Sequence, residues 1–306
     1  HTGNKSNPHG VTASQLGLGK TLTFTGAVSA AYDGTAAKAV NIPSGKRTCR
    51  FVVGTSTAGW TANDCDYLCD GVDDQVEINA AIEALPEGGG EVVILDGEYV
   101  FTSSILISRP NVVLTGNHRT VLSGASLHTS GTAIITIGPY AHYCRICNVT
   151  LSLGPCAYQR GIAVGGWYSV ISNNCVFYSA GSSVYAIELA GSHNLVYANR
   201  IFGVMSNQDL SNYAILVGGS DSVIAGNYIK DCDTGLRVQN AKRSLLVGNH
   251  IVRGIGLSTN YSPSQYTVQF VKTNNEYNLI ADNFILGKNY VSEGGISNTF
   301  MNNKYN

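Results

Sequence analysis

The second half of the sequence repeats one short phrase built around an asparagine. Each copy reads as a polar residue, two apolar residues, two small or polar residues, Asn, any residue and an apolar residue, as in SVIAGNYI at residues 222–229. The regular copies contain Asn174, Asn199, Asn227, Asn249 and Asn283, a less regular copy contains Asn148, and a terminal copy contains Asn303. Repeats of roughly 20 to 50 residues are typical of stacked architectures. Each unit contains short strands and no helix, so the phrase predicts a solenoid of β coils.

The asparagine of each phrase is predicted to form the corner of its coil. Asn tolerates left-handed backbone conformations, and its side chain bonds readily to nearby backbone groups. Stacked coils are about 4.8 Å apart, so corner residues fall into a column whose side chains bond to those above and below. We interpret this column as internal scaffold without a chemical role.

A second repeated segment lies upstream of each asparagine and alternates in polarity, as in GIAVGG (161–166) and GLRVQN (235–240). Alternation sends every second side chain inward. The inward pairs are Ile162/Val164, Ile187/Leu189, Ile215/Val217, Leu236/Val238 and Val268/Phe270, and the outward central column is Ala163, Glu188, Leu216, Arg237 and Gln269. The connection that precedes this segment varies in length, and variable loops on one face of a solenoid are common recognition sites.

Composition narrows the partners of the chain. The net charge of -1 and the 13% charged residues offer no basic footprint for nucleic acid. No apolar stretch approaches the roughly 18 residues of a membrane-spanning helix, so we expect no membrane insertion. The sequence begins at His1 rather than Met, and we expect a fragment or a processed product.

Cysteine usage favours structural roles. The chain has 8 Cys, and the spacing Cys144–Cys147 has no second ligand pair at a useful distance. We interpret most of them as small interior residues of the coils, with no metal site. This usage is consistent with folding in a bacterial cytoplasm and action outside the cell.

The N-terminal 19 residues carry a specific motif. His1, Gly3, Asn7, Pro8, His9, Val11, Thr12 and Gln15 match the pattern HxGxxxNPHxVTxxQ. This segment resembles one that recurs in bacteriophage tail-spike and tail-fibre proteins. The resemblance implies a stem or connector at residues 1–19, a homotrimer, and contacts with other virion proteins through the N-terminus. Residues 20–64 alternate around a YDG turn and predict a small β module.

Residues 65–101 predict a helix followed by a strand. The helix runs from about Val72 to Leu85 with Asp70 as its cap, and Pro86 and the following glycines end it. The pattern DGxxDxxxIxxAI, then GGG, resembles the opening of pectate-lyase-like right-handed parallel β-helices. In that family the helix covers the open end of the solenoid. The resemblance implies an all-β, right-handed, single-stranded parallel β-helix over residues 65–306, and we interpret the acidic run Asp70, Asp73, Asp74 and Glu77 as helix capping rather than a metal site.

Candidate catalytic residues are few. Glycoside hydrolysis needs two carboxylates, and a lyase needs a basic group beside acids that can hold calcium. The outward column supplies Glu188 and Arg237, and the variable loops supply Asp209, Asp231 and Asp233. None of these residues forms a known catalytic motif, and Asp231 and Asp233 also fit an ordinary acidic turn.

Candidate binding residues are aromatic. Tyr and Trp rings suit the faces of sugars, while neighbouring polar groups supply directional hydrogen bonds. The set predicted to contact saccharide is Tyr158, Trp167, Tyr185, Tyr213 and Tyr266, and Tyr178, Tyr261 and Tyr290 lie in or beside the same variable loops. Packing against the coil flank or a neighbouring subunit is the alternative role.

These features suggest a trimeric phage tail-spike or tail-fibre protein that binds bacterial surface polysaccharide, in the virion or outside the cell. Depolymerisation of the glycan stays open. One alternative is a polysaccharide lyase or glycoside hydrolase as the primary activity. The other is a structural virion or surface protein with no glycan ligand. No cofactor is expected, except calcium if the chain is a lyase.

Overall fold

The computed structural model describes residues 22–24, 30–32, 49–154, 158–178, 184–203, 212–253, 266–271, 274–287, 291–292 and 295–305. The chain divides into two units, His1–Arg47 and Thr48–Asn306. In the first unit, β1 (Leu22–Phe24) and β2 (Ala30–Tyr32) form an antiparallel pair. The second unit contains the repeats.

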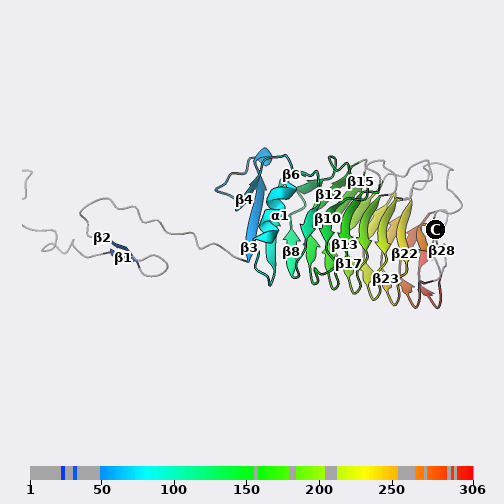
Figure 1. Cartoon of the computed structure of the whole chain (residues 1–306). Coiled ribbons are helices and arrows are strands. Elements are labelled where there is room, and N and C mark those ends of the chain that lie inside the picture. The colour runs from blue at the N-terminus through cyan, green and yellow to red at the C-terminus, as the bar shows by residue number, and fades with distance from the viewer. Residues whose placement is uncertain are drawn as a thin grey trace, which may run out of the picture. The chain divides into compact units, whose positions relative to one another are not determined.

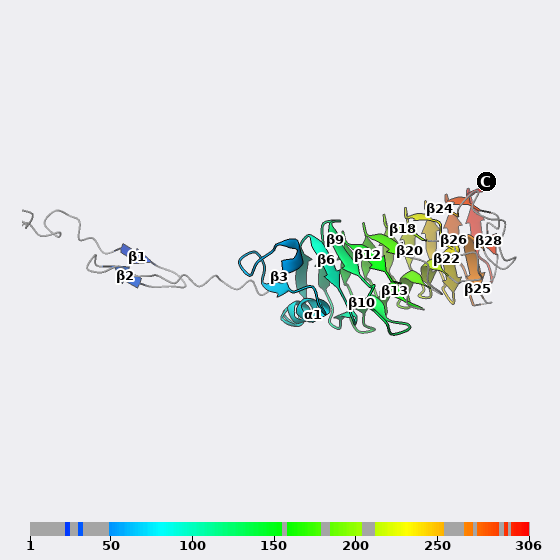
Figure 2. The same cartoon turned by 90° about the horizontal axis from the view of Figure 1, so that it is seen from above.

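The second unit is a right-handed parallel β-helix with three parallel sheets. Each coil runs through sheet I, then sheet II, then sheet III (Figures 1 and 2). Sheet I consists of β7 (Ile105–Ile107), β10 (Ala133–Ile137), β13 (Arg160–Val164), β16 (Tyr185–Leu189), β19 (Tyr213–Val217), β22 (Thr234–Gln239), β25 (Val268–Val271) and β28 (Val291–Ser292). Sheet II consists of β4 (Tyr67–Cys69), β3 (Arg50–Thr55), β5 (Gly90–Ile94), β8 (Val112–Thr115), β11 (Arg145–Cys147), β14 (Val170–Ser172), β17 (Leu195–Tyr197), β20 (Val223–Ala225), β23 (Leu245–Val247), β26 (Leu279–Ala281) and β29 (Thr299–Met301). Sheet III consists of β6 (Gly97–Val100), β9 (Thr120–Ser123), β12 (Thr150–Leu153), β15 (Cys175–Tyr178), β18 (Arg200–Phe202), β21 (Tyr228–Lys230), β24 (His250–Val252), β27 (Phe284–Leu286) and β30 (Lys304–Tyr305).

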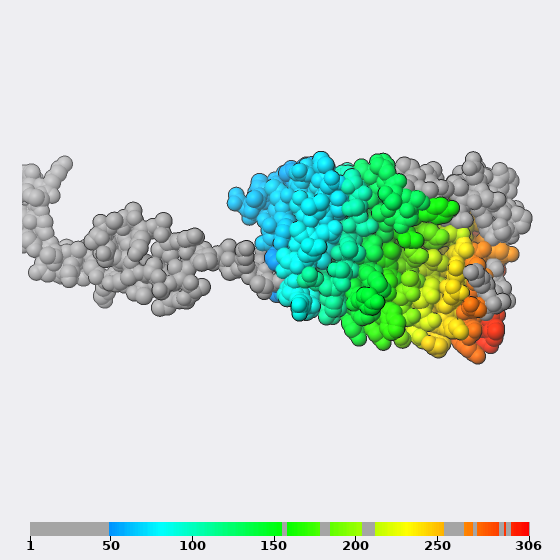
Figure 3. Space-filling view, in the orientation of Figure 1, coloured from blue at the N-terminus to red at the C-terminus, as the bar shows by residue number. Residues whose placement is uncertain are grey.

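The interior of the coils is apolar, as the alternation predicts. Every side chain that was predicted to point inward in sheet I, from Ile162 to Phe270, is at most 4% exposed. Strand pairing also places the predicted outward residues in one register column, Ala163, Glu188, Leu216, Arg237 and Gln269. The coils follow one another as successive colour bands on the surface (Figure 3). The β-helix prediction is therefore confirmed, together with its register.

The repeated asparagines form the predicted buried ladder. The Oδ1 atom of Asn227 accepts hydrogen bonds from the backbone N–H and the side-chain amide of Asn199, both at 3.0 Å. Asn227 in turn donates to Asn249 at 2.9 Å and to the carbonyl of Val196 at 3.0 Å. The ladder runs through Asn174, Asn199, Asn227, Asn249, Asn283 and Asn303.

Two details of the corner differ from the prediction. The left-handed residue is the one before each ladder asparagine, for example Ala198, Gly226 and Gly248, with φ between 55° and 63°. Asn148 also has a positive φ of 60°. The backbone N–H of Val149 donates to Asn174, so Val149 holds the ladder position and Asn148 precedes it. The ladder therefore depends on the side-chain amide of Asn, and the sharp turn is made by its neighbour.

A second polar ladder, which was not predicted from the sequence, lies at the corner between sheets I and II. The side-chain oxygens of Asn194, Ser222, Ser244, Asn278 and Asn298 each accept a backbone N–H from the coil before. These residues are the polar first position of the repeated phrase. The two ladders satisfy backbone N–H groups that would otherwise be buried without a partner.

Helix α1 (Gln75–Glu83) covers the N-terminal end of the coils. It is shorter than the predicted helix, and its N-terminal cap position is Asp74 rather than Asp70. Ile78, Ala81 and Ile82 of this helix are buried and belong to the apolar core of the coils.

Polar side chains of α1 and of its N-terminal cap position form hydrogen bonds with backbone N–H and C=O groups at the edge of the first coil. The Asp74 carboxylate accepts backbone N–H groups from Val100 and Gly71, both at 2.8 Å. Asn79 accepts the N–H of Leu106 at 2.8 Å and donates to the carbonyl of Ser104 at 3.2 Å. Capping of the solenoid end therefore accounts for Asp74 in the acidic run.

The predicted boundary between the small β module and the β-helix is wrong. We placed it between residues 64 and 65, but β3 pairs in parallel with β5 inside sheet II. The two units separate after Arg47. The partner strand β5 lies some 40 residues further along the chain, so the sequence around β3 gives no sign of this pairing and suggests a local hairpin module instead. No helix in the described part of the chain has the length and apolar character needed to cross a bilayer.

Candidate functional site

In the sequence, the strands of sheet I follow the connections of variable length that come after the strands of sheet III. Strands β13, β16, β19 and β22 begin with Arg160, Tyr185, Tyr213 and Thr234, which pair in register. A small buried residue follows each of them: Gly161, Ala186, Ala214 and Gly235. This small residue interrupts the alternation of inward and outward side chains. The residue that begins each strand therefore lies on the same side of the sheet as the outward column that contains Glu188.

Five side chains from four successive coils meet on this face. Nε of Arg160 lies 2.6 Å from Oε2 of Glu188. The rings of Tyr185 and Tyr213 stack, with centroids 5.2 Å apart and an interplanar angle of 26°. The Arg237 guanidinium lies 4.4 Å from the Tyr213 ring centroid and donates a hydrogen bond to the Tyr213 hydroxyl. We call these five residues the sheet I cluster.

Burial and charge shape the chemistry of the cluster. Burial raises the pKa of the Tyr185 hydroxyl, and the neighbouring Tyr213 raises it further. Glu188 forms an ion pair with Arg160. The cluster therefore offers two guanidinium groups, two phenols and one carboxylate within one surface.

The predicted acidic residues do not gather there, apart from Glu188. Asp231 lies in the turn after β21, where its Oδ2 atom is 3.9 Å from Nζ of Lys230. Asp233 is 2% exposed, and its carboxylate accepts the backbone N–H of Asn212 at 3.4 Å. Strand register places Asp233 next to Asn212 in the corner of the stack. Burial in this corner separates Asp233 from any solvent-borne substrate, which argues against the catalytic role that we predicted for it.

A pair of facing carboxylates is absent from the described part of this column. The register neighbours of Glu188 are Ala163 and Leu216. Asp209 lies outside the described residues. Hydrolysis by two carboxylates therefore has no second acid among the described neighbours of Glu188.

The predicted aromatic residues are split between separate places. Tyr185 and Tyr213 belong to the cluster, but Tyr213 is 7% exposed and lies between Tyr185 and Arg237. Its ring faces are therefore unavailable for stacking on a sugar. Tyr158, which is exposed, and Tyr266, which is half-buried, precede β13 and β25. Tyr261 and Tyr290 lie outside the described residues, as does the side chain of Tyr178.

Trp167 lies at the other end of β13, in the turn to sheet II. It is 48% exposed, and its ring lies between His142 and His193, with centroid distances of 5.9 and 6.1 Å. Tyr143, Tyr168 and His193 stack in the same turn region. Trp167 therefore belongs to a different aromatic surface from Tyr185 and Tyr213.

Arg160 was missed by the sequence analysis. Strict alternation from Ile162 sends it inward, because the interruption at Gly161 is invisible to that rule. The signal was nonetheless present: R-G-I, Y-A-I, Y-A-I and T-G-L recur at the start of the four strands. Aligning the small residue of each triplet places Arg160, Tyr185 and Tyr213 in one column.

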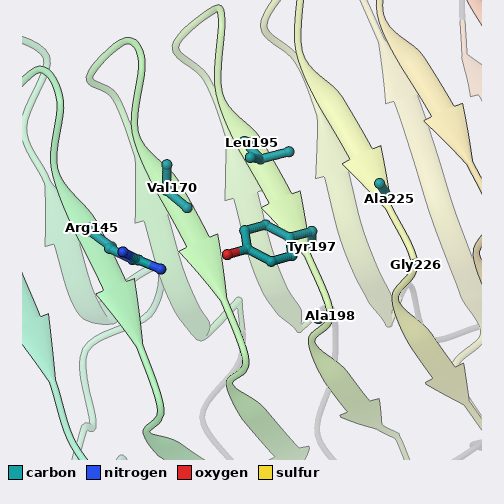
Figure 4. A pocket seen from close by; sticks show the side chains of 7 residues that line it. All are labelled: Arg145, Val170, Leu195, Tyr197, Ala198, Ala225 and Gly226. Atoms are coloured by element: carbon teal, nitrogen blue, oxygen red, sulfur yellow. The ribbon is translucent and has the colours of Figure 1, made fainter.

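An open hollow lies on the outer face of sheet II (Figure 4). Its volume is about 570 Å³, and it is lined by Arg145, Val170, Leu195, Tyr197, Ala198, Ala225 and Gly226. The Tyr197 hydroxyl points across the Val170 strand toward the Arg145 side (Figure 4). This groove contains no carboxylate or imidazole, so its chemistry is that of an apolar surface with two polar groups.

Solved structures with the same fold include a phage tailspike protein and two bacterial proteins. A tailspike protein mutant of E. coli bacteriophage HK620, solved with a pentasaccharide, superposes with a TM-score of 0.53 at 13% identity, covering 76% of this chain and 54% of that one. The protein sacteLam55A from Streptomyces sp. SirexAA-E gives 0.52 at 13% identity, covering 69% and 41%. DFA-IIIase from Arthrobacter chlorophenolicus A6, solved with GF2, gives 0.51 at 13% identity, covering 70% and 54%. The predicted likeness to the β-helix of phage tailspikes is confirmed at the level of fold.

This chain spans about half the length of those proteins or less. No curated protein matches the sequence. One family model, described as periplasmic copper-binding protein (NosD), matches residues 94–306. Because this match covers most of the β-helix and more than half of the 306 residues, the chain belongs to the NosD family.

Proposed function

We propose that this chain is the receptor-binding β-helix of a phage tail-spike or tail-fibre protein and that it binds a bacterial surface polysaccharide on the outer face of sheet I. The observation that carries the proposal is the sheet I cluster. Its charged and phenolic groups come from successive coils and are already held together by an ion pair, a ring stack and a cation–π contact.

The cluster suits glycan recognition because its polar groups are preorganised. Side chains that are fixed before binding lose little conformational entropy when a ligand arrives. Carboxylate, guanidinium and phenol groups together supply both donors and acceptors for sugar hydroxyls. A ligand that lies along the β-helix axis would meet the cluster coil by coil, about every 4.8 Å.

The fold supports saccharide sites in other proteins. The HK620 tailspike was solved with a pentasaccharide, and DFA-IIIase was solved with GF2. At 13% identity these structures support the proposal through their architecture and do not transfer any residue role.

We propose binding as the primary activity, with polysaccharide lyase or glycoside hydrolase activity as the alternative. The ion-paired Glu188 has Ala163 and Leu216 as register neighbours, and Asp233 is buried. In the lyase alternative the Tyr213 phenol, whose oxygen accepts a hydrogen bond from the charged Arg237 guanidinium, would be the group that moves the proton. Calcium would be needed only in that alternative.

Copper, which the family description names, does not fit the described residues. Copper prefers thiolate, thioether and imidazole ligands. Among the described residues, the one close group of three His, Cys, Asp or Glu side chains is Cys69, Asp74 and Glu77, which precedes the residues matched by the family model. Both Asp74 carboxylate oxygens already accept backbone N–H groups, and the Cys69 thiol donates to the Asp74 carbonyl at 3.7 Å, so the polar atoms of this group hold the N-terminal cap together. We therefore derive no function from copper.

The test is a binding assay on an array of bacterial surface polysaccharides with the purified full chain. We expect the wild type to bind one or more glycans, and Tyr185→Ala and Glu188→Gln to weaken binding roughly tenfold or more. Tyr140→Ala is the matched control, because Tyr140 is 82% exposed and lies in the turn after β10, away from the cluster. Thermal unfolding of each variant shows that it is folded.

Product analysis of the same mixtures separates binding from cleavage. Release of reducing ends or unsaturated sugars would make the enzyme alternative correct. Failure of the wild type to bind any glycan would leave the structural virion role. Equal binding by wild type and both cluster variants would show that the site lies elsewhere.

We propose that copies of the chain assemble as homotrimers in the virion or outside the cell, with the N-terminal segment contacting other virion proteins. The support is the N-terminal resemblance to phage tail proteins. Light scattering coupled to size-exclusion chromatography measures the mass directly, and a monomer at micromolar concentration would contradict the trimer.

A further inference from the structure

The two arginines of the sheet I cluster differ in their partners. Arg160 forms a close ion pair with Glu188 and also donates to the carbonyl of Gly131 at 3.1 Å. Arg237 contacts the Tyr213 ring and hydroxyl, and no carboxylate pairs with it in the described part of the chain. The positive charge of Arg160 is therefore balanced within the cluster, while that of Arg237 is not.

The surroundings of Arg237 hold this charge in place without neutralising it. Its register neighbours are Leu216 and Gln269, which carry no charge. The Tyr213 ring beneath the guanidinium is itself held in place by stacking against the ring of Tyr185. A cation over an aromatic ring is stabilised by the ring quadrupole and keeps its charge. Arg237 therefore presents a positioned, half-buried guanidinium on the outer face of sheet I.

A guanidinium has five N–H donors, and one of them is directed at the Tyr213 hydroxyl. The remaining donors have the planar geometry that suits carboxylate and phosphate oxygens. A neutral sugar hydroxyl would satisfy those donors but leave the charge unbalanced. An anionic substituent would satisfy both the donors and the charge.

We infer that the glycan bound on sheet I is acidic and that its anionic group, a carboxylate or a phosphate, binds to the guanidinium of Arg237. This inference rests on the glycan-binding function proposed above and specifies the class of its ligand. It assigns Arg237 as the residue that selects acidic over neutral polysaccharide.

The experiment uses the same array, sorted into acidic and neutral polysaccharides, and then the acidic glycan that binds best. Its carboxylates are reduced to alcohols in one sample, and its phosphates are removed with hydrofluoric acid in another. We expect one of the two treatments to weaken binding about tenfold or more, which also identifies the anionic group. Binding of the untreated glycan should weaken as salt increases.

Variants assign the effect to the residue. Arg237→Gln should bind the untreated glycan about as weakly as the wild type binds the treated one, and Arg237→Lys should recover part of the difference because it keeps the charge. Arg243→Gln is the control: Arg243 is also an outer-surface arginine, but it is paired with Asp221 at 2.6 Å. Thermal unfolding of Arg237→Gln checks that the cluster still folds.

The outcomes separate the two proposals. The inference of an acidic ligand is wrong if the wild type binds only neutral glycans. It is also wrong if Arg237→Gln discriminates treated from untreated glycan as the wild type does. In both cases the proposal of glycan binding stands. If no polysaccharide binds, both proposals are wrong.

Discussion

The guanidinium of Arg237 lies over the ring of Tyr213, 4.4 Å from its centroid, and donates a hydrogen bond to the hydroxyl of the same residue. The two residues belong to successive coils of sheet I. One contact depends on the ring and the other on the oxygen, so a single substitution can separate them.

Tyr213→Phe should keep the ring contacts and remove the hydrogen bond. We expect the free energy of unfolding to fall by about 1 kcal/mol, which is typical of one hydrogen bond. Affinity for the acidic glycan should fall a few-fold, because the guanidinium loses one of its two anchors. Urea unfolding and calorimetric titration measure the two effects. A variant with wild-type affinity would show that the hydroxyl does not position Arg237.

Asn227→Ala should be strongly destabilising. Asn227 is 1% exposed, and its side chain accepts from Asn199 and donates to Asn249 and Val196. Its loss leaves buried partners without hydrogen bonds, at about 1–3 kcal/mol for each unsatisfied group. Asn303→Ala is the matched control at the end of the ladder, where the side chain is half-buried. Its unfolding midpoint should change less; equal losses would contradict a cooperative ladder.

Asp233→Ala should affect stability rather than chemistry. The carboxylate is buried and accepts the backbone N–H of Asn212. Removal leaves that N–H unsatisfied, and we expect a loss of about 1–3 kcal/mol in the free energy of unfolding. Any residual folded protein should bind glycan as the wild type does. A stable Asp233→Ala variant without activity would instead support the catalytic role first predicted.

The pair Asp221–Arg243 gives a pH-dependent contribution to stability. The hydrogen bond from Arg243 holds the pKa of the Asp221 carboxyl below its ordinary value. A carboxyl with a lowered folded pKa stabilises the folded state above its unfolded pKa of about 3.9, and this contribution disappears as the pH falls through the folded pKa. Asp221→Asn should therefore lower the unfolding midpoint slightly at pH 7 and have no effect in strong acid. An effect of the same size at both pH values would contradict the ion pair.

The described cysteines should differ sharply in reactivity. Cys49 is exposed, whereas Cys69 and Cys144 are buried and burial raises the pKa of both thiols. The thiolate is the reactive form. Iodoacetamide should therefore modify Cys49 in the native protein and reach Cys69 and Cys144 only after unfolding, as peptide mass spectrometry would show. Rapid native labelling of Cys69 would mean that the N-terminal cap opens.

The sequence alone determined the architecture of the coils. The spacing of Asn174, Asn199 and Asn227 predicted the ladder, and alternation predicted the buried column from Ile162 to Phe270. Both predictions succeeded because a repeat places equivalent residues next to each other, and stacked backbones then impose one register. The acidic run before Ile78 was predicted to cap the helix through Asp70, but Asp74 holds the cap position and its carboxylate accepts backbone N–H groups of Gly71 and Val100 instead.

The site required the tertiary structure. Two contacts of the site run diagonally between neighbouring coils, from Arg160 to Glu188 and from Tyr213 to Arg237. The residues of each pair lie in different columns, so the periodicity of the sequence does not predict that their side chains meet. The small residues Gly161 and Ala186 turn the first residue of each strand outward, which strict alternation cannot anticipate. Repetition thus decides the backbone, because backbone hydrogen bonds recur in every coil. The function depends on side-chain contacts that occur once, and only the packed structure brings those together.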